Sequence, residues 1–173
     1  MNDVNTIDDL MKYMDENIKY GWLGIDGKVR IDSLKDFKDY YRTMNIDDVI
    51  KCGVGLCPDQ VNFIKNFFDS KNIQNKIFVI VGYENVLGID KERVHFMIFY
   101  ENDNTWYQFE HASRFFKGIF KYGSLSDTKN KVLDKYKEIL KNAKLFEIDG
   151  IPVGIGYDEL RNLIIKKLYE KKS

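Results

Sequence analysis

The sequence is poor in cysteine and proline, and each shortage excludes a class of protein. It has two residues of each type among 173. Cys52 and Cys57 offer no second pair for a disulfide framework, so a reducing, cytoplasmic setting is favoured over secretion. Pro58 and Pro152 do not lie in linker-like stretches, and the chain has no repeat or low-complexity segment. The sequence therefore predicts one domain over residues 1–173.

The chain also lacks a net charge and any long apolar run. Lys plus Arg total 27 and Asp plus Glu total 27, so no overall field favours nucleic acid or an anionic membrane. No apolar stretch approaches the roughly 18 residues of a transmembrane helix. The first residues carry acids and no apolar core, which is not typical of a signal peptide. We therefore expect neither a nucleic-acid partner nor a membrane partner.

Apolar periodicity predicts helices at both ends of the chain and strands in its middle. A helix is expected to begin at Thr6, where Asp9 three residues later completes a capping box. Further helices are expected from Ser33, over 47–51, from Cys57, over 129–142 and over 157–170. Strands are expected at 76–83, 93–100 and 105–111. This order predicts an α+β fold with an antiparallel sheet.

Cys57 stands where a loop meets a helix. Gly53-Val54-Gly55 marks a turn, and Pro58 suits the first turn of a helix because its missing N–H is not needed there. A cysteine at a helix N-terminus lies near unpaired N–H groups and the positive end of the macrodipole, which favour the nucleophilic thiolate over the thiol. The backbone N–H of Cys57 is a natural donor to an oxyanion.

The last two predicted strands place a histidine opposite an acid. Residues 101–104 are rich in turn formers, and a loop of two or four residues there pairs positions whose numbers sum to 205. His95 then lies directly opposite Glu110, with Cβ atoms roughly 4.5–5.5 Å apart. A loop of three residues would shift the register by one and break this pairing. Cys57, His95 and Glu110 thus supply a nucleophile, a base and an acid that orients the base.

These residues also resemble those of a known family. A cysteine at a helix start, a histidine on a strand and an acid on the next strand follow the order of the transglutaminase-like superfamily, within the papain-like fold. Gly55-Leu56-Cys57-Pro58-Asp59-Gln60 resembles the Gly-x-Cys-Trp-Asp-Gln segment of small bacterial members. Phe109-Glu110-His111-Ala112 resembles their aromatic-Glu-His segment, and Tyr20-Gly21-Trp22 and Lys117-Gly118-Ile119 also fit. The resemblance runs over about residues 20–122.

The resemblance implies both a fold and an activity. The fold would place the nucleophile-bearing helix on an antiparallel sheet, with extra helices at both ends of the chain. The activity would be that of a cysteine-dependent hydrolase or acyl transferase acting on an amide or peptide bond of a peptide or protein, through a thioester and without a cofactor. Water or an amine as acceptor, and any oligomeric state, are compatible with it. Pro58 and Glu110 depart from the usual Trp and Asp.

Other interpretations of the same residues remain open. The chain is alternatively a catalytically inactive peptide-binding module on the same scaffold, with Cys57 an inert buried thiol and His95 a core histidine. His111 is an alternative base, although on a regular strand it faces the other side from Glu110. A zinc site built from Cys52, Cys57, His95 and His111 is disfavoured because their spacings are not those of common zinc modules.

Overall fold

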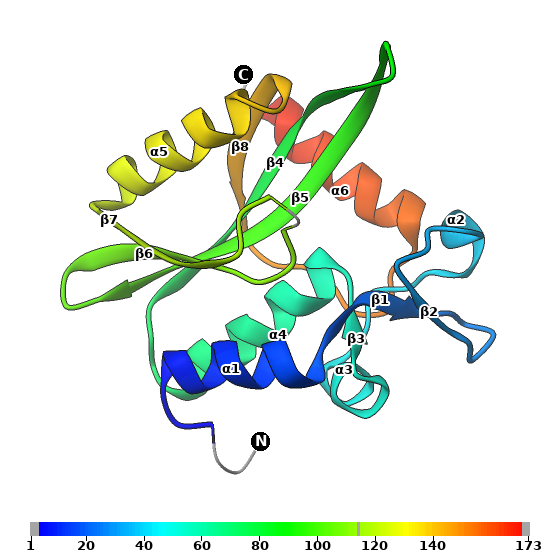
Figure 1. The fold of residues 1–173 in the computed structure, drawn as a ribbon, viewed down its shortest axis with the longest axis horizontal. Coiled ribbons are helices and arrows are strands. Elements are labelled where there is room, and N and C mark those ends of the chain that lie inside the picture. Colours follow the sequence, from blue (N-terminus) through cyan, green and yellow to red (C-terminus); the bar gives the residue numbers. More distant parts are fainter. Residues whose placement is uncertain (1–3, 114, 171–173) are drawn as a thin grey trace.

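A five-stranded antiparallel sheet organises the computed structural model, which describes residues 4–113 and 115–170 (Figure 1). The strand order is β7-β6-β5-β4-β8, and a smaller sheet has the order β2-β1-β3. The helices are α1 (Ile7–Asn17), α2 (Phe37–Tyr40), α3 (Ile46–Cys52), α4 (Cys57–Ser70), α5 (Leu125–Lys137) and α6 (Tyr157–Glu170). The strands are β1 (Lys19–Leu23), β2 (Val29–Ile31), β3 (Val54–Gly55), β4 (Asn75–Val86), β5 (Ile89–Asn102), β6 (Thr105–Glu110), β7 (Gly118–Gly123) and β8 (Lys141–Ile148). The predicted α+β class with an antiparallel sheet is confirmed.

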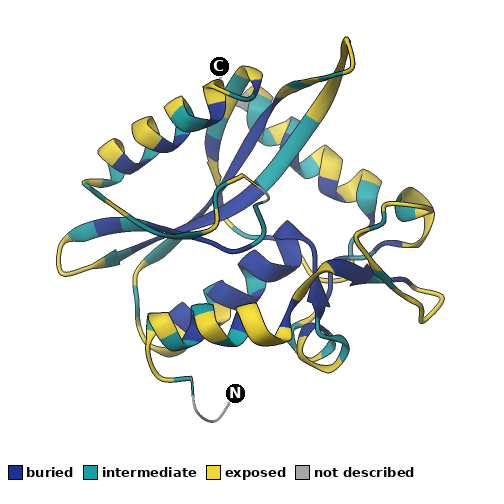
Figure 2. Cartoon of the chain, in the orientation of Figure 1, coloured by how far each residue is buried: buried dark blue, intermediate teal, exposed yellow. Residues whose placement is uncertain are grey.

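The large sheet separates two apolar cores. The larger core joins one face of the sheet to α1, α4 and α6, and the smaller joins the other face to α5. α4 is the most deeply buried helix, as Figure 2 shows, with Phe63 and Phe68 fully enclosed. Burial of each such ring contributes roughly 1.5–3 kcal/mol to stability. Among the described residues, no helix is both long and apolar enough to cross a membrane.

Local sequence signals placed several helices correctly. Thr6 caps α1 as predicted, with Asp9 N–H donating to Thr6 Oγ1 over 3.1 Å and Thr6 N–H donating to Asp9 Oδ2 over 2.9 Å. α3 covers the short helix expected at 47–51, and α6 has the expected bounds. α4 begins at Cys57 as expected.

The long helix expected from Ser33 is wrong, because only the four residues of α2 are helical there. The apolar residues whose spacing predicted this helix instead form a tertiary contact, because the aromatic ones among them pack on Trp22. The rings of Phe37 and Tyr41 lie 5.7 and 6.1 Å from the indole. Trp22 Nε1 also donates to the carbonyl of Ser33 over 2.7 Å, which holds this residue outside any helix. Tertiary contacts therefore override the local period.

The helix expected over 129–142 is displaced, and five strands were not predicted, namely β1, β2, β3, β7 and β8. α5 starts at Leu125, capped by Ser124, and ends at Lys137. The next residues form β8 on the outer edge of β4, while β7 and β1 also pair where no strand was expected. These five strands are short or only partly buried, so they carry little apolar alternation for a sequence pattern to detect.

The predicted register of the β5–β6 hairpin is off by two residues. Asn102 pairs with Thr105 and Ile98 pairs with Phe109, so paired numbers sum to 207. The loop consists of Asp103 and Asn104, whose φ angles of 50° and 57° are those of a type I′ turn. A shift of two leaves every side chain on its predicted face, whereas a shift of one would have reversed the faces.

The conformation of this turn makes a stability prediction. Replacing Asn104 by Val puts a β-branched side chain at positive φ, which we expect to lower the free energy of unfolding by about 1–2 kcal/mol. Urea unfolding followed by circular dichroism measures the change. Asn104→Gly is the control and is expected to be at least as stable as the parent. Equal stability of the Val and Gly variants would contradict the turn as described.

Candidate active site

Cys57 is the first residue of α4, at the end of a tightly held segment. Gly53 ends α3 with φ at 63°, a left-handed conformation that glycine adopts without strain. β3 then pairs in parallel with β1 and directs the chain into the helix. Leu56 is the N-cap, and Pro58 occupies the first turn, where no N–H is needed. The prediction that Cys57 stands at a helix N-terminus is confirmed, and its side chain is nearly buried.

The carboxylate of Asp59 fixes the chain around this cysteine. Asp59 is 1% exposed and accepts hydrogen bonds from the Leu56 N–H at 3.0 Å, the Met44 N–H at 2.7 Å and the Tyr41 hydroxyl at 3.0 Å. Burial raises the pKa of Asp59 to about 7, against these three hydrogen bonds, which favour the charged form. The sequence predicted only an acid in the first turn. The structure adds that Asp59 ties α4 to the segment after α2.

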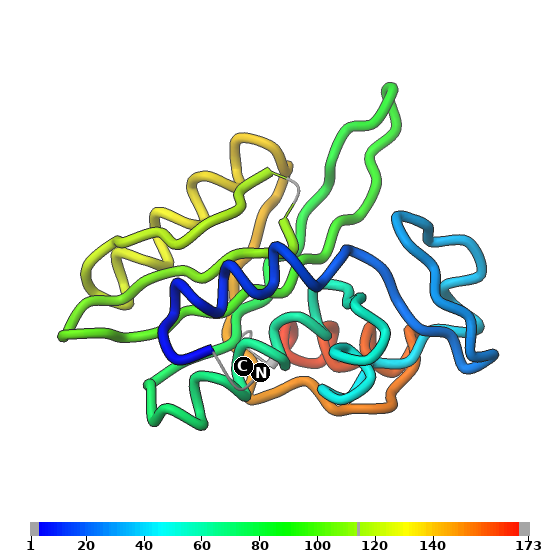
Figure 3. The backbone as a smooth tube through the Cα atoms, turned by 60° about the horizontal axis from the view of Figure 1, so that its bottom comes forward, coloured from blue at the N-terminus to red at the C-terminus, as the bar shows by residue number. Residues whose placement is uncertain are grey.

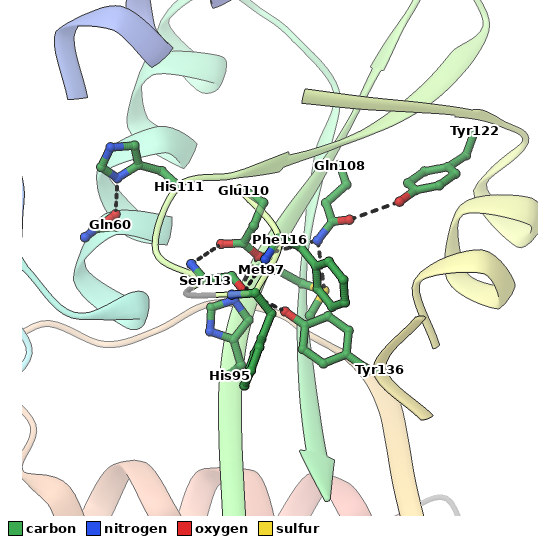
Figure 4. A network of polar contacts seen from close by, with 11 residues as sticks. Gln60, His95, Met97, Gln108, Glu110, His111, Ser113, Phe116, Tyr122 and Tyr136 are labelled. Atoms are coloured by element: carbon green, nitrogen blue, oxygen red, sulfur yellow. Dashed lines mark hydrogen bonds and ion pairs between the residues drawn. The ribbon is translucent and has the colours of Figure 1, made fainter. Parts of the chain in front are cut away.

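His95 lies on β5 at a point that β6 no longer covers. Its Nε2 is 2.8 Å from Glu110 Oε2, so the predicted contact between these two side chains is confirmed (Figure 4). Glu110 reaches His95 diagonally rather than from directly opposite, because the register is shifted by two. With Nε2 engaged by the acid, Nδ1 is the ring nitrogen that remains available, and Cys57 at the start of α4 interacts with the ring.

The protonated form of His95 is strongly favoured. Burial of the ring works against its charge, but the negative charge of Glu110 and hydrogen bonds with Cys57 and Glu110 outweigh it. Together they raise the pKa of His95 to about 10. The cysteine, the histidine and the acid are therefore brought together as one electrostatic unit.

Glu110 is itself held in place by neighbours on both of its oxygens. The side chain is 2% exposed, and Oε1 accepts the Ser113 N–H at 2.9 Å. Oε2 also lies 3.4 Å from Nε2 of Gln108, whose own oxygen accepts the Tyr122 hydroxyl at 3.4 Å. Figure 4 shows these contacts running through the sheet from Glu110 to Tyr122. A buried carboxylate with several donors keeps one orientation, which is what a group that orients a histidine requires.

α5 supplies one wall of the site. The ring of Tyr136 stacks near His95, with centroids 6.0 Å apart and an interplanar angle of 26°. The Tyr136 hydroxyl lies 3.5 Å from Ser113 Oγ, and that Oγ accepts the N–H of Phe116 at 3.2 Å. Ser113 and Phe116 thus pack against Tyr136 beside the histidine.

His111 points away from this unit, toward α4 (Figure 4). Its Nδ1 donates to Gln60 Oε1 over 2.6 Å, and Gln60 Nε2 donates to the Gly55 carbonyl over 2.8 Å. Nε2 of His111 lies 3.2 Å from Asp15 Oδ1 but outside hydrogen-bonding geometry. Burial, and then the charge of Lys117, lower the pKa of His111. His111 therefore supports the segment before Cys57, and the sequence missed this role because nothing local links Gln60 to it.

A cleft of about 900 Å³ opens over Cys57 and His95. Its volume lies near the upper end of the range for ligand sites. The cleft extends from these two residues along β5, and its other walls come from β1, the segment around α2, and α6. The lining that lies away from the two reactive residues is mostly apolar, and it includes Leu34, Phe37, Tyr157, Leu160 and Ile164.

Both cysteines are free thiols, and Cys52 does not line this cleft. Within residues 4–113 and 115–170, no three His, Cys, Asp or Glu side chains converge to hold a metal ion. The four residues weighed for a zinc site are therefore not gathered into one.

The raised pKa of Asp59 predicts a pH dependence of stability. The folded chain keeps a proton that the unfolded chain releases, so this group's contribution falls as pH rises from about 4 to about 7 and is constant above that. About three pKa units correspond to roughly 4 kcal/mol at most. We expect Asp59→Asn to remove this slope in urea unfolding measured at several pH values. Parallel stability profiles for parent and variant would contradict the assignment.

A scan against protein-family models and a search of curated proteins both found no match to this chain. The geometry of the site is therefore the basis for a functional proposal.

Proposed function

We propose that the protein is a cysteine-dependent hydrolase or acyl transferase that acts on amide or peptide bonds. In this proposal Cys57 is the nucleophile, His95 the base and Glu110 the acid that orients it. The observation that carries the proposal is the position of His95, which contacts the Glu110 carboxylate through Nε2 and interacts with the Cys57 thiol. The resemblance to the transglutaminase-like superfamily of the papain-like fold points to the same chemistry.

The first half of the reaction forms a thioester. Cys57 transfers its proton to Nδ1 of His95, and the resulting thiolate attacks the carbonyl carbon of the amide. The carbonyl oxygen takes up the electron pair and accepts a hydrogen bond from the backbone N–H of Cys57. When the tetrahedral intermediate collapses, the C–N bond breaks and His95 gives its proton to the departing amine.

The second half releases the acyl group. Water or a second amine gives a proton to His95 as it attacks the thioester carbon, and the thiolate of Cys57 leaves. Glu110 keeps its charge throughout and holds the Nε2–H, so that Nδ1 stays directed at the thiol. The raised pKa of His95 supports the proposal because it favours the imidazolium that the thiolate needs as a partner.

Thiol reactivity tests the nucleophile without knowledge of a substrate. We expect iodoacetamide at about pH 6 to alkylate Cys57 at least roughly tenfold faster than Cys52, because the proposed ion pair with His95 stabilises the reactive thiolate. Site-resolved mass spectrometry gives both rates in one sample. His95→Ala is expected to remove the difference. If Cys57 reacts no faster than Cys52, the enzyme proposal fails and the inactive binding module takes its place.

The charge of Glu110 makes a separate prediction about His95. Glu110→Gln keeps the size of the side chain but removes its negative charge, so we expect the pKa of His95 to fall from about 10 by at least one unit. Titration of the His95 ring signals by NMR measures the fall. Glu138→Gln makes the same change on an exposed side chain and is expected to leave the pKa of His95 unaltered. An unshifted titration in Glu110→Gln would show that the acid does not act on the histidine.

A further inference from the structure

β5 is much longer than β6, the strand that pairs with it on one of its two sides. It pairs with β4 from Ile89 to Tyr100, but with β6 only from Ile98 to Asn102. The stretch over residues 89–97 is therefore an edge strand on the side that β6 does not reach. Figures 1 and 3 show this half of the β4–β5 hairpin extending beyond the rest of the sheet.

The register determines which backbone groups lie on this edge. Antiparallel strands bond through alternate residues, and β5 uses Ile98, Tyr100 and Asn102 toward β6. The residues of odd number bond to β4, because the two-residue turn at Leu87 and Gly88 starts that ladder with Val86 opposite Ile89. The even-numbered residues of the edge are Asp90, Glu92, Val94 and Phe96, and they direct their N–H and C=O groups outward. Within the described part of the chain, no strand pairs with them on that side.

This edge leads into the candidate active site. The part of β5 from Glu92 to Phe96 forms a wall of the cleft and ends beside Cys57. Charged side chains at Asp90, Lys91 and Glu92 discourage uncontrolled pairing, as is usual on exposed edges. A short edge strand would be enough to prevent unwanted pairing with other chains. β5 is instead long, and its free edge extends from His95 to the hairpin tip.

The hairpin tip at the far end is unusually apolar. Leu87 is 97% exposed and adopts a φ of 53°, a conformation that is rare for leucine, and Ile89 is 64% exposed. A chain that followed the edge outward from the cleft would pass these side chains. The edge therefore offers main-chain hydrogen bonds along its length and an apolar contact at its end.

We propose that the free edge of β5 binds the substrate as an added strand, so that the substrate is an extended polypeptide. This inference rests on the function proposed above and names its substrate class. Main-chain groups of the polypeptide bond to Glu92 and Val94, which lie on the accessible part of the edge, and this pairing directs one of its carbonyl groups toward Cys57. From Asp90 to Val94 the accessible edge spans about 14 Å at roughly 3.4 Å per residue. A small amide would use only the end of this surface.

A tethered peptide tests this strand addition. The probe is a heptapeptide of alternating threonine and valine with a terminal cysteine, joined by a disulfide to Cys57 in a Cys52→Ser protein. Two versions, with the cysteine at either end, cover both strand directions. We expect exchange of the amide hydrogens of Glu92 and Val94 to slow about tenfold or more on attachment. The amide of Arg93 already bonds to β4 and is expected to change little.

The matched control is the same peptide with alternate backbone amides N-methylated, which attaches but cannot pair as a strand. It is expected to leave exchange at Glu92 and Val94 as in the free protein. If both unmodified peptides attach and exchange is unchanged, the proposal is overturned. It is overturned equally if neither peptide attaches while iodoacetamide modifies Cys57, because the cleft then does not admit a chain. Attachment needs no turnover, so this result is independent of whether the amide chemistry occurs.

Discussion

The early end of the β5–β6 pairing is the constraint on which the site depends. Pairing stops at Ile98 and Phe109, and β6 turns away after Glu110. This leaves His95 on an uncovered part of β5, close enough for Glu110 to reach it diagonally and open enough for Cys57 to approach from α4. Had the ladder continued, β6 would cover the edge of β5 beside His95 and close it to a substrate. A site of this kind needs a sheet in which one strand, here β6, ends before its neighbour, here β5.

Two buried carboxyl groups near this opening, Glu110 and Asp59, are each held by several partners. A buried carboxylate such as Glu110 is unfavourable alone, because removal from water costs more than one partner returns. Glu110 has His95 on one oxygen and a backbone N–H on the other, with Gln108 close by. Asp59 also accepts hydrogen bonds from three donors on two segments of chain, and these offset part of the cost of burying its carboxylate. Loss of either carboxylate would therefore affect both the packing around the cysteine and its chemistry.

The sequence predicted the position of Cys57 and the contact between His95 and Glu110 better than it predicted the sheet. Glycines and Pro58 before an apolar face were enough to place Cys57 at a helix start, because capping is local. The hairpin register was wrong by two, since turn formers extend over residues 101–104 and do not say which pair forms the turn. The predicted contact of His95 with Glu110 is still formed, because a register shift of two residues leaves both side chains on the same face of the sheet. The helix expected from Ser33 failed and β8 was missed, since packing on Trp22 and pairing with β4 are decided by distant parts of the chain.

The cleft must satisfy two opposing demands. An imidazolium and a thiolate attract most strongly where water is excluded, yet a polypeptide can enter only an open groove. In the structure the His95 side chain is 15% exposed and Cys57 is 7% exposed, so both remain partly in contact with the groove. A substrate strand lying on β5 would cover both residues and strengthen their interaction as it binds. A strand bound to the free edge would then have two effects. It would position the peptide bond, and it would exclude water from the site where that bond is to be cleaved.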